Sequence, residues 1–232
     1  MADQPVIESA RFEVALQSLG ELREFYRGSL GVPGVVAASD HLQLEVGSAR
    51  VGFVGVESGR PFHHFALLVS AERFSAAAAW LSGATDLLSR SAEGDPTFTF
   101  DAWDARACYA LDPAGNVLEL IAHNCTGVAA RPGRFSGAEL LGISEVGLVV
   151  SDRPAAVRDL AAVGLPMWAG QLDQLRWPVF VGRQANTLVL SPPGRAWLPT
   201  ESAAGLYTST TVIRAGGRIR ISVADGRLNI HT

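Results

Sequence analysis

The sequence predicts an α+β protein made of repeated units, each with one strand, one helix and about three further strands (βαβββ) in antiparallel or mixed sheets. Three segments share one pattern, in which an ionisable residue precedes four or five mostly apolar residues and a serine: Glu13–Ser18, His64–Ser70 and Glu145–Ser151. Such an apolar run is typical of a buried strand, and a serine after it often begins a helix. Because one unit cannot bury its sheet face alone, we expect units to pair.

A helix-like run follows each of these strands. Apolar residues recur at helical spacing between Leu19 and Leu30, and Gly31 can end that helix in the left-handed conformation. The run Ala71–Leu81 also places apolar residues on one face. In the third unit Pro154 stands near the first helical turn, where its missing N–H costs nothing.

Strand-like segments then complete each unit. They cover 41–46 and 50–56 in the first unit, 97–100, 106–111 and 117–123 in the second, and 178–181 and 187–190 in the third. The tail adds 208–214, 218–223 and 228–231 without a helix. We therefore expect two paired units in residues 1–125, a linker at 126–139 and a partial second domain at 140–232. The tail, or a second copy in a homodimer, would cover the third unit.

Composition limits the classes of function. The net charge is −4, so no basic surface for nucleic acid is expected. All 19 basic residues are arginine, and the absence of lysine excludes Schiff-base chemistry and a Walker-type phosphate loop. The N-terminus does not resemble a signal peptide, and no apolar stretch has membrane-spanning length. We expect a soluble, cytoplasmic protein whose partner is a small molecule, with neither nucleic acid nor membrane.

Three segments carry a family resemblance: 13–31, 62–69 and 109–120, the last with the turn Asp112-Pro-Ala-Gly-Asn116 before an apolar-Glu-apolar strand. They resemble the vicinal oxygen chelate superfamily, which includes glyoxalases, bleomycin-resistance proteins and extradiol dioxygenases. The resemblance implies sheets curled into a cup. It also implies a divalent metal on the inner face, held by residues from the first and last strands of a module.

Carried over to this chain, the resemblance implies Glu13, His64 and Glu119 as metal ligands. One imidazole and two carboxylates would suit iron, manganese, nickel, cobalt or zinc. Glu145 occupies the first-strand position of the third unit, but Val189 stands at its paired last-strand position, so we interpret Glu145 as structural. Ring-cleaving dioxygenases of this group use two histidines and one carboxylate. Because Glu13 stands in place of the first histidine, the sequence favours lyase or isomerase chemistry over ring cleavage by a dioxygenase.

Four further residues are candidates for substrate chemistry. Tyr109 could donate a hydrogen bond to a developing oxyanion. His123 shares a strand face with Glu119 and is a candidate acid or base. Trp103 and Arg106 precede the penultimate strand, where a cup meets its ligand, and Arg106 could clamp a substrate carboxylate.

Two main functions remain open from the sequence. The first is a metal-dependent enzyme acting on a small molecule with neighbouring oxygens, of the lyase, isomerase or ring-cleaving type. The alternative is a metal-free protein that binds or sequesters a small molecule, like the bleomycin-resistance proteins. A structural module with a vestigial cup is a third interpretation.

Overall fold

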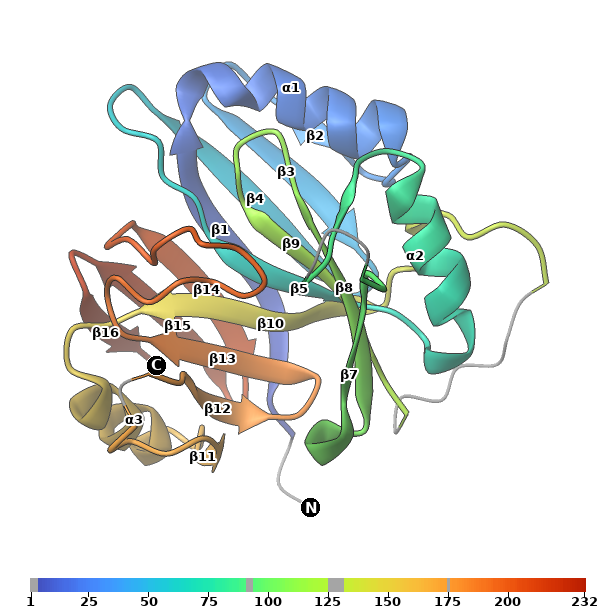
Figure 1. Cartoon of the computed structure of the whole chain (residues 1–232). Coiled ribbons are helices and arrows are strands. Elements are labelled where there is room, and N and C mark those ends of the chain that lie inside the picture. Colours follow the sequence, from blue (N-terminus) through green and yellow to red (C-terminus); the bar gives the residue numbers. More distant parts are fainter. Residues whose placement is uncertain (1–3, 91–93, 125–131, 175) are drawn as a thin grey trace.

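The computed structural model describes residues 4–90, 94–124, 132–174 and 176–232. Two mixed sheets carry helices α1 (Leu19–Arg23), α2 (Phe74–Ser82) and α3 (Arg153–Ala162) (Figure 1). Helical turns at Leu16–Ser18 and Glu24–Ser29 extend α1 at both ends. None of the helices in the described ranges is long and apolar enough to cross a membrane.

The first sheet has seven strands in the order β16-β15-β14-β1-β4-β3-β2. Their bounds are β1 Val6–Ala15, β2 Val36–Ala37, β3 His41–Val46, β4 Ala49–Val56, β14 Ser209–Arg214, β15 Arg218–Ala224 and β16 Arg227–His231. The first unit and the tail build this sheet. They join where β1 pairs antiparallel with β14, while β1 and β4 run parallel.

The second sheet has nine strands in the order β11-β12-β13-β10-β5-β9-β8-β6, with β7 paired to β8. Their bounds are β5 His64–Leu68, β6 Leu87–Leu88, β7 Thr97–Phe100, β8 Ala105–Leu111, β9 Val117–His123, β10 Gly142–Val149, β11 Met167–Ala169, β12 Val179–Arg183 and β13 Asn186–Ser191. The second and third units build it, and they join where β5 pairs antiparallel with β10.

This strand order differs from the expected pairing of the first two units within residues 1–125. Each sheet instead combines one unit from each half of the chain, and the second unit, not the tail, pairs with the third. All units offer an equivalent apolar first strand with an open edge, so local sequence does not specify which edges meet. The predicted linker 126–139 lies partly outside the described residues, since 125–131 are not among them.

The two sheets pack back to back through aromatic side chains. Phe12 of β1 stacks on Phe65 of β5 with ring centroids 5.2 Å apart, and Phe53 of β4 lies 6.1 Å from the same ring. Side chains alternate along a strand. The neighbours of Phe65 on β5, His64 and Ala66, therefore face away from this shared core.

The turn between β8 and β9 positions the candidate site. Asp112 accepts hydrogen bonds from the backbone N–H groups of Ala114 and Asn116, from the Asn116 side chain and from the Tyr26 hydroxyl. The Asn116 side chain in turn accepts a bond from the backbone N–H of His63, at 2.8 Å. These bonds fix the register of β9 against β5. They therefore also fix the position of Glu119, which follows Asn116 by three residues.

Candidate metal centre

Three strands bring the candidate ligands onto one row of the nine-stranded sheet. Ala66 on β5 pairs with Glu119 on parallel β9 and with Glu145 on antiparallel β10, so the two carboxylates flank it. His64 lies two residues before Ala66 and faces the same side. The small alanine side chain leaves room between its larger neighbours, and the three ionisable groups converge above it.

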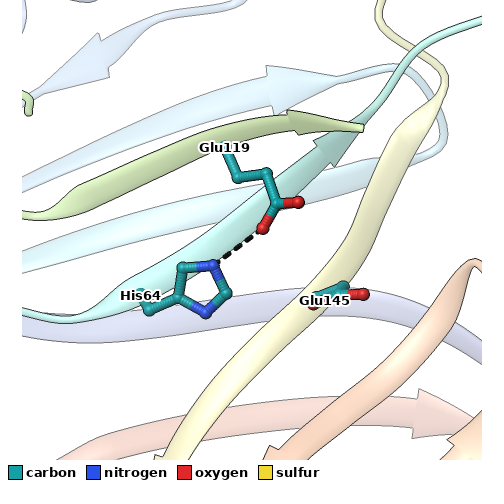
Figure 2. A group of neighbouring side chains, drawn as sticks. All are labelled: His64, Glu119 and Glu145. Carbon is teal, nitrogen blue, oxygen red and sulfur yellow. Dashed lines mark hydrogen bonds and ion pairs between the residues drawn. The ribbon is translucent and has the colours of Figure 1, made fainter. Parts of the chain in front are cut away.

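The three side chains form one buried group (Figure 2). Their ligand atoms lie within 4.8 Å of one another, and the Nε2 atom of His64 is 2.9 Å from Oε2 of Glu119. The exposed fractions are 6% for His64, 2% for Glu119 and 5% for Glu145. Burial this complete is costly for charged groups unless something compensates them.

Burial shifts the pKa of each member towards its neutral form. Loss of water raises the pKa of Glu119 to about 8, against which a hydrogen bond from Tyr109 acts. The pKa of Glu145 rises to about 8 through burial and then through the charge of Glu119. Burial lowers the pKa of His64 to about 4. At neutral pH, without a cation, the stable form is therefore a neutral, hydrogen-bonded group.

The donor set fits a divalent transition metal. One imidazole and two carboxylates are the ligands found at such sites in proteins. The Nδ1 atom of His64 is buried and has no hydrogen-bond partner among the described residues. The bond to Glu119 uses the other ring nitrogen, Nε2, so a cation held through Nδ1 would give this buried atom a partner.

Trp197 covers this group from the segment between β13 and β14. Its ring centroid lies 5.1 Å from that of His64, and the side chain is 3% exposed. A Cβ added to Gly147 would lie 2.7 Å from Cη2 of Trp197, so a glycine on β10 is needed to admit the indole. Backbone hydrogen bonds across 194–204 hold this segment as a hairpin, with Trp197 against His64.

Glu13, the third ligand expected from the sequence, is not in this group. It lies on β1 of the seven-stranded sheet and is half-buried, whereas His64 and Glu119 belong to the nine-stranded sheet. Its backbone carbonyl faces the ring of His63, 3.0 Å from Nε2. The pairing of the units explains why Glu13 is absent from the group. The strand beside β5 is β10, and the β10 residue that pairs with Ala66 is Glu145.

The two candidate catalytic residues lie in different places. Tyr109 on β8 pairs directly with Glu119, and its hydroxyl bonds to that carboxylate, so it orients a candidate ligand. His123 lies four residues beyond Glu119, about 13 Å along the strand. Its Nε2 is 3.2 Å from the Ser144 hydroxyl and its Nδ1 is 3.0 Å from Nε2 of Gln184. Both ring nitrogens of His123 therefore have partners away from the candidate centre.

The two candidate substrate-binding residues also separate. Arg106 faces the helix side of β8, where it donates to the carbonyl of Ala71 at 2.8 Å and covers the ring of Phe74. Side-chain alternation places Arg106 and Tyr109 on opposite faces, so Arg106 lies on the face of the sheet away from Glu119. Trp103 packs 4.5 Å from Phe180 in an aromatic cluster on the cup side.

Glu145 is the member of the group that our sequence reasoning assigned to a structural role. The signal was present, since Glu145 occupies the same place in its repeat as His64 does in the second unit. The sequence-based interpretation rests on Val189, which is not a ligand and stands at the paired position of the same unit. In the structure Glu145 needs no ligand from its own unit, because Glu119 and His64 come from the neighbouring one.

Comparisons with known proteins identify the fold. Neither a family model nor a curated protein matches the sequence. Among solved structures, a putative dioxygenase from Bacillus subtilis aligns with 95% of this chain and 85% of its own, at a TM-score of 0.55 and 14% identity. Glyoxalase I from Zea mays aligns with 96% of this chain and 93% of its own, at a TM-score of 0.52 and 12% identity. The chain therefore shares its fold with these two structures, as the family resemblance in its sequence predicted.

Proposed function

We propose that this chain binds one divalent transition metal ion through His64, Glu119 and Glu145 and acts as a metal-dependent enzyme on a small molecule with neighbouring oxygen atoms. The observation that carries the proposal is the convergence of three buried side chains whose ligand atoms lie within 4.8 Å of one another. Iron, manganese, nickel, cobalt and zinc all accept this donor set. A bound ion would act as a Lewis acid toward the two substrate oxygens.

The other residues of the cup have supporting roles. Tyr109 holds the Glu119 carboxylate in place through its hydroxyl. Trp197 excludes water from the ligands, because it packs over His64 and is itself buried. A substrate that approaches His64 from this side would have to displace the Trp197 indole.

The aromatic lining supports a second candidate, a metal-free binding protein. Phe98, Trp103, Phe180 and Trp197 all pack on the cup side of the nine-stranded sheet. With the segment 192–206 displaced, these side chains would offer an apolar surface to a small aromatic compound. Thermal stabilisation by such a compound that chelators and Glu119→Gln leave unchanged would favour this candidate over the enzyme.

Metal analysis of matched variants tests the enzyme proposal. The protein is loaded in turn with each of the five metals, without oxygen for iron, and passed through a desalting column. Bound metal is then measured by mass spectrometry. We expect about one ion per chain in the wild type and in Glu13→Gln, and strong loss in Glu119→Gln and Glu145→Gln, because each removes one of three ligands.

Two results would overturn the assignment. Wild-type protein that retains none of the five metals would exclude the proposed centre. Full occupancy in Glu145→Gln together with loss in Glu13→Gln would instead support the ligand set expected from the sequence. Circular dichroism of each variant shows whether a loss of metal reflects a lost ligand or a lost fold.

A further inference from the structure

The seven-stranded sheet has an outward face of its own, which our sequence analysis did not single out. This face lines an open depression of about 630 Å³. Strands from both ends of the chain build the sheet (Figure 1). Four arginines line the depression: Arg11 of β1, Arg50 of β4, and Arg218 and Arg220 of β15. We call these four residues and the depression between them the arginine cup.

Strand register explains how the arginines surround a common floor. Arg220 pairs with Val212, Val212 with Ser9 and Ser9 with Arg50, so one row crosses four neighbouring strands. The two arginines at the ends of this row are three strand spacings apart, about 14 Å between their Cα atoms. Val212 and Ser9 occupy the floor between them, and the long arginine side chains can reach over it.

In the next row, Arg11 pairs with Thr210 on one side and with Gly52 on the other. Gly52 has no side chain, and the stem of Arg11 lies beside it, so that a Cβ at position 52 would be 3.7 Å from Cγ of Arg11. Hydroxyl groups of Thr210 and Ser222 also line the depression, as does His231 at the end of β16. The arginine cup therefore offers several hydrogen-bond donors around a shallow, polar centre.

Among the described residues, no carboxylate side chain lines the arginine cup. Within the described ranges, Arg11, Arg50 and Arg220 form no ion pair, and Arg218 lies 3.4 Å from an oxygen of Glu8, which also pairs with Arg214. Glu45 is opposite Arg50 on β3 without forming an ion pair with it. Four like charges gathered in one depression of a chain with net charge −4 form an attractive site for an anion.

Asp40 is a further nearby carboxyl. The charge of Arg11 contributes to lowering its pKa, but the main cause is the hydrogen bond that it makes with His41, at 2.9 Å. Asp40 does not line the depression. The guanidinium of Arg11 therefore stays available to a ligand.

We propose that the arginine cup binds a small organic molecule carrying at least two phosphate or carboxylate groups. The planar guanidinium fork matches both groups, and arginine is the residue type that binds them in bidentate fashion. A single anion fills little of a depression of about 630 Å³, whereas arginines on three strands can hold separate anionic groups of one molecule. This site is independent of the candidate metal centre, which lies on the other sheet.

Isothermal titration at low ionic strength tests the proposal, with pyrophosphate and citrate as separate probes. Their relative affinities distinguish a phosphate ligand from a carboxylate ligand. We expect at least one probe to bind, and Arg11→Gln/Arg220→Gln to weaken its binding by at least about tenfold, because charged hydrogen bonds are lost. The control Arg158→Gln changes an exposed arginine of α3 that pairs with Asp159, and it should bind like the wild type.

Further outcomes decide the proposal. Binding should persist in Glu119→Gln, which separates this site from the metal centre. The absence of binding by both probes at millimolar concentration would overturn the proposal, as would equal binding by the wild type and the double arginine variant. If a DNA oligonucleotide binds and neither probe does, the small-ligand proposal is wrong and the arginine cup is a nucleic-acid-binding surface.

Discussion

Glu145→Gln should stabilise the metal-free protein at alkaline pH. The substitution keeps the shape of the side chain but removes a carboxyl that burial and Glu119 hold in its neutral form, with a pKa raised to about 8. Above that pH the wild-type fold must accommodate a buried carboxylate beside a second one. Glutamine in the same place carries no charge at any pH.

The magnitude follows from the raised pKa. A change from the ordinary value of 4.5 to about 8 corresponds to about 5 kcal/mol at a pH above both values. Two unit charges 4.8 Å apart repel by about 3 kcal/mol at an effective dielectric constant of about 20, so the repulsion by Glu119 accounts for part of it. We therefore expect a gain of about 3 to 5 kcal/mol at pH 9.

The sign is set by proton binding. The folded protein holds the Glu145 proton up to about pH 8, whereas the unfolded chain releases it near 4.5. The free energy of unfolding is thus unaffected by this group below 4.5 and falls as the pH rises to 8. The difference between variant and wild type should be small at about pH 5 and reach its maximum near pH 9.

Urea unfolding in the presence of a chelator measures this difference, with Glu13→Gln of the other sheet as the control. Added metal should reverse the trend for the wild type, because it stabilises the ionised carboxylates. A wild-type free energy of unfolding that is equal at both pH values without metal would refute the reasoning. So would a Glu145→Gln protein that is less stable than the wild type at about pH 9.

Two predictions concern the segments that close the fold. Truncation after Ala204 removes β14 to β16 and exposes the edge of β1, so we expect aggregation on size-exclusion chromatography; a soluble monomer of unchanged stability would contradict this. Trp197→Ala should lower the free energy of unfolding by about 3 to 5 kcal/mol, because it leaves a cavity above His64 and Gly147. A loss below about 1 kcal/mol in urea would show that the indole is not packed there.

Local pattern determined much of the secondary structure. The predicted strands at 41–46 and 117–123 coincide with β3 and β9, because alternating or continuous apolar runs report directly on burial. The run from Ala71 forms a helical turn followed by α2. Strand alternation alone also predicts that Arg106 and Tyr109 cannot line the same site, because residues three positions apart on a strand face opposite sides.

The sequence also identified two of the three residues that converge. His64 and Glu119 belong to one unit, in which β9 pairs with β5 and the Asn116 side chain of the preceding turn accepts a hydrogen bond from the backbone N–H of His63. Both positions are therefore determined within a short stretch of chain. The resemblance carried by the same stretch predicted the fold that the comparisons with solved structures show.

The tertiary structure alone decided which units share a sheet. First strands of equal apolar character can pair in several ways, and the choice depends on contacts between segments more than a hundred residues apart, such as β1 with β14. That choice placed Glu145 beside Glu119 and left Glu13 on the other sheet. It also brought Arg220 of the tail onto the same face as Arg50 of the first unit. Periodicity records which face of a strand is buried, but not which strand will lie beside it.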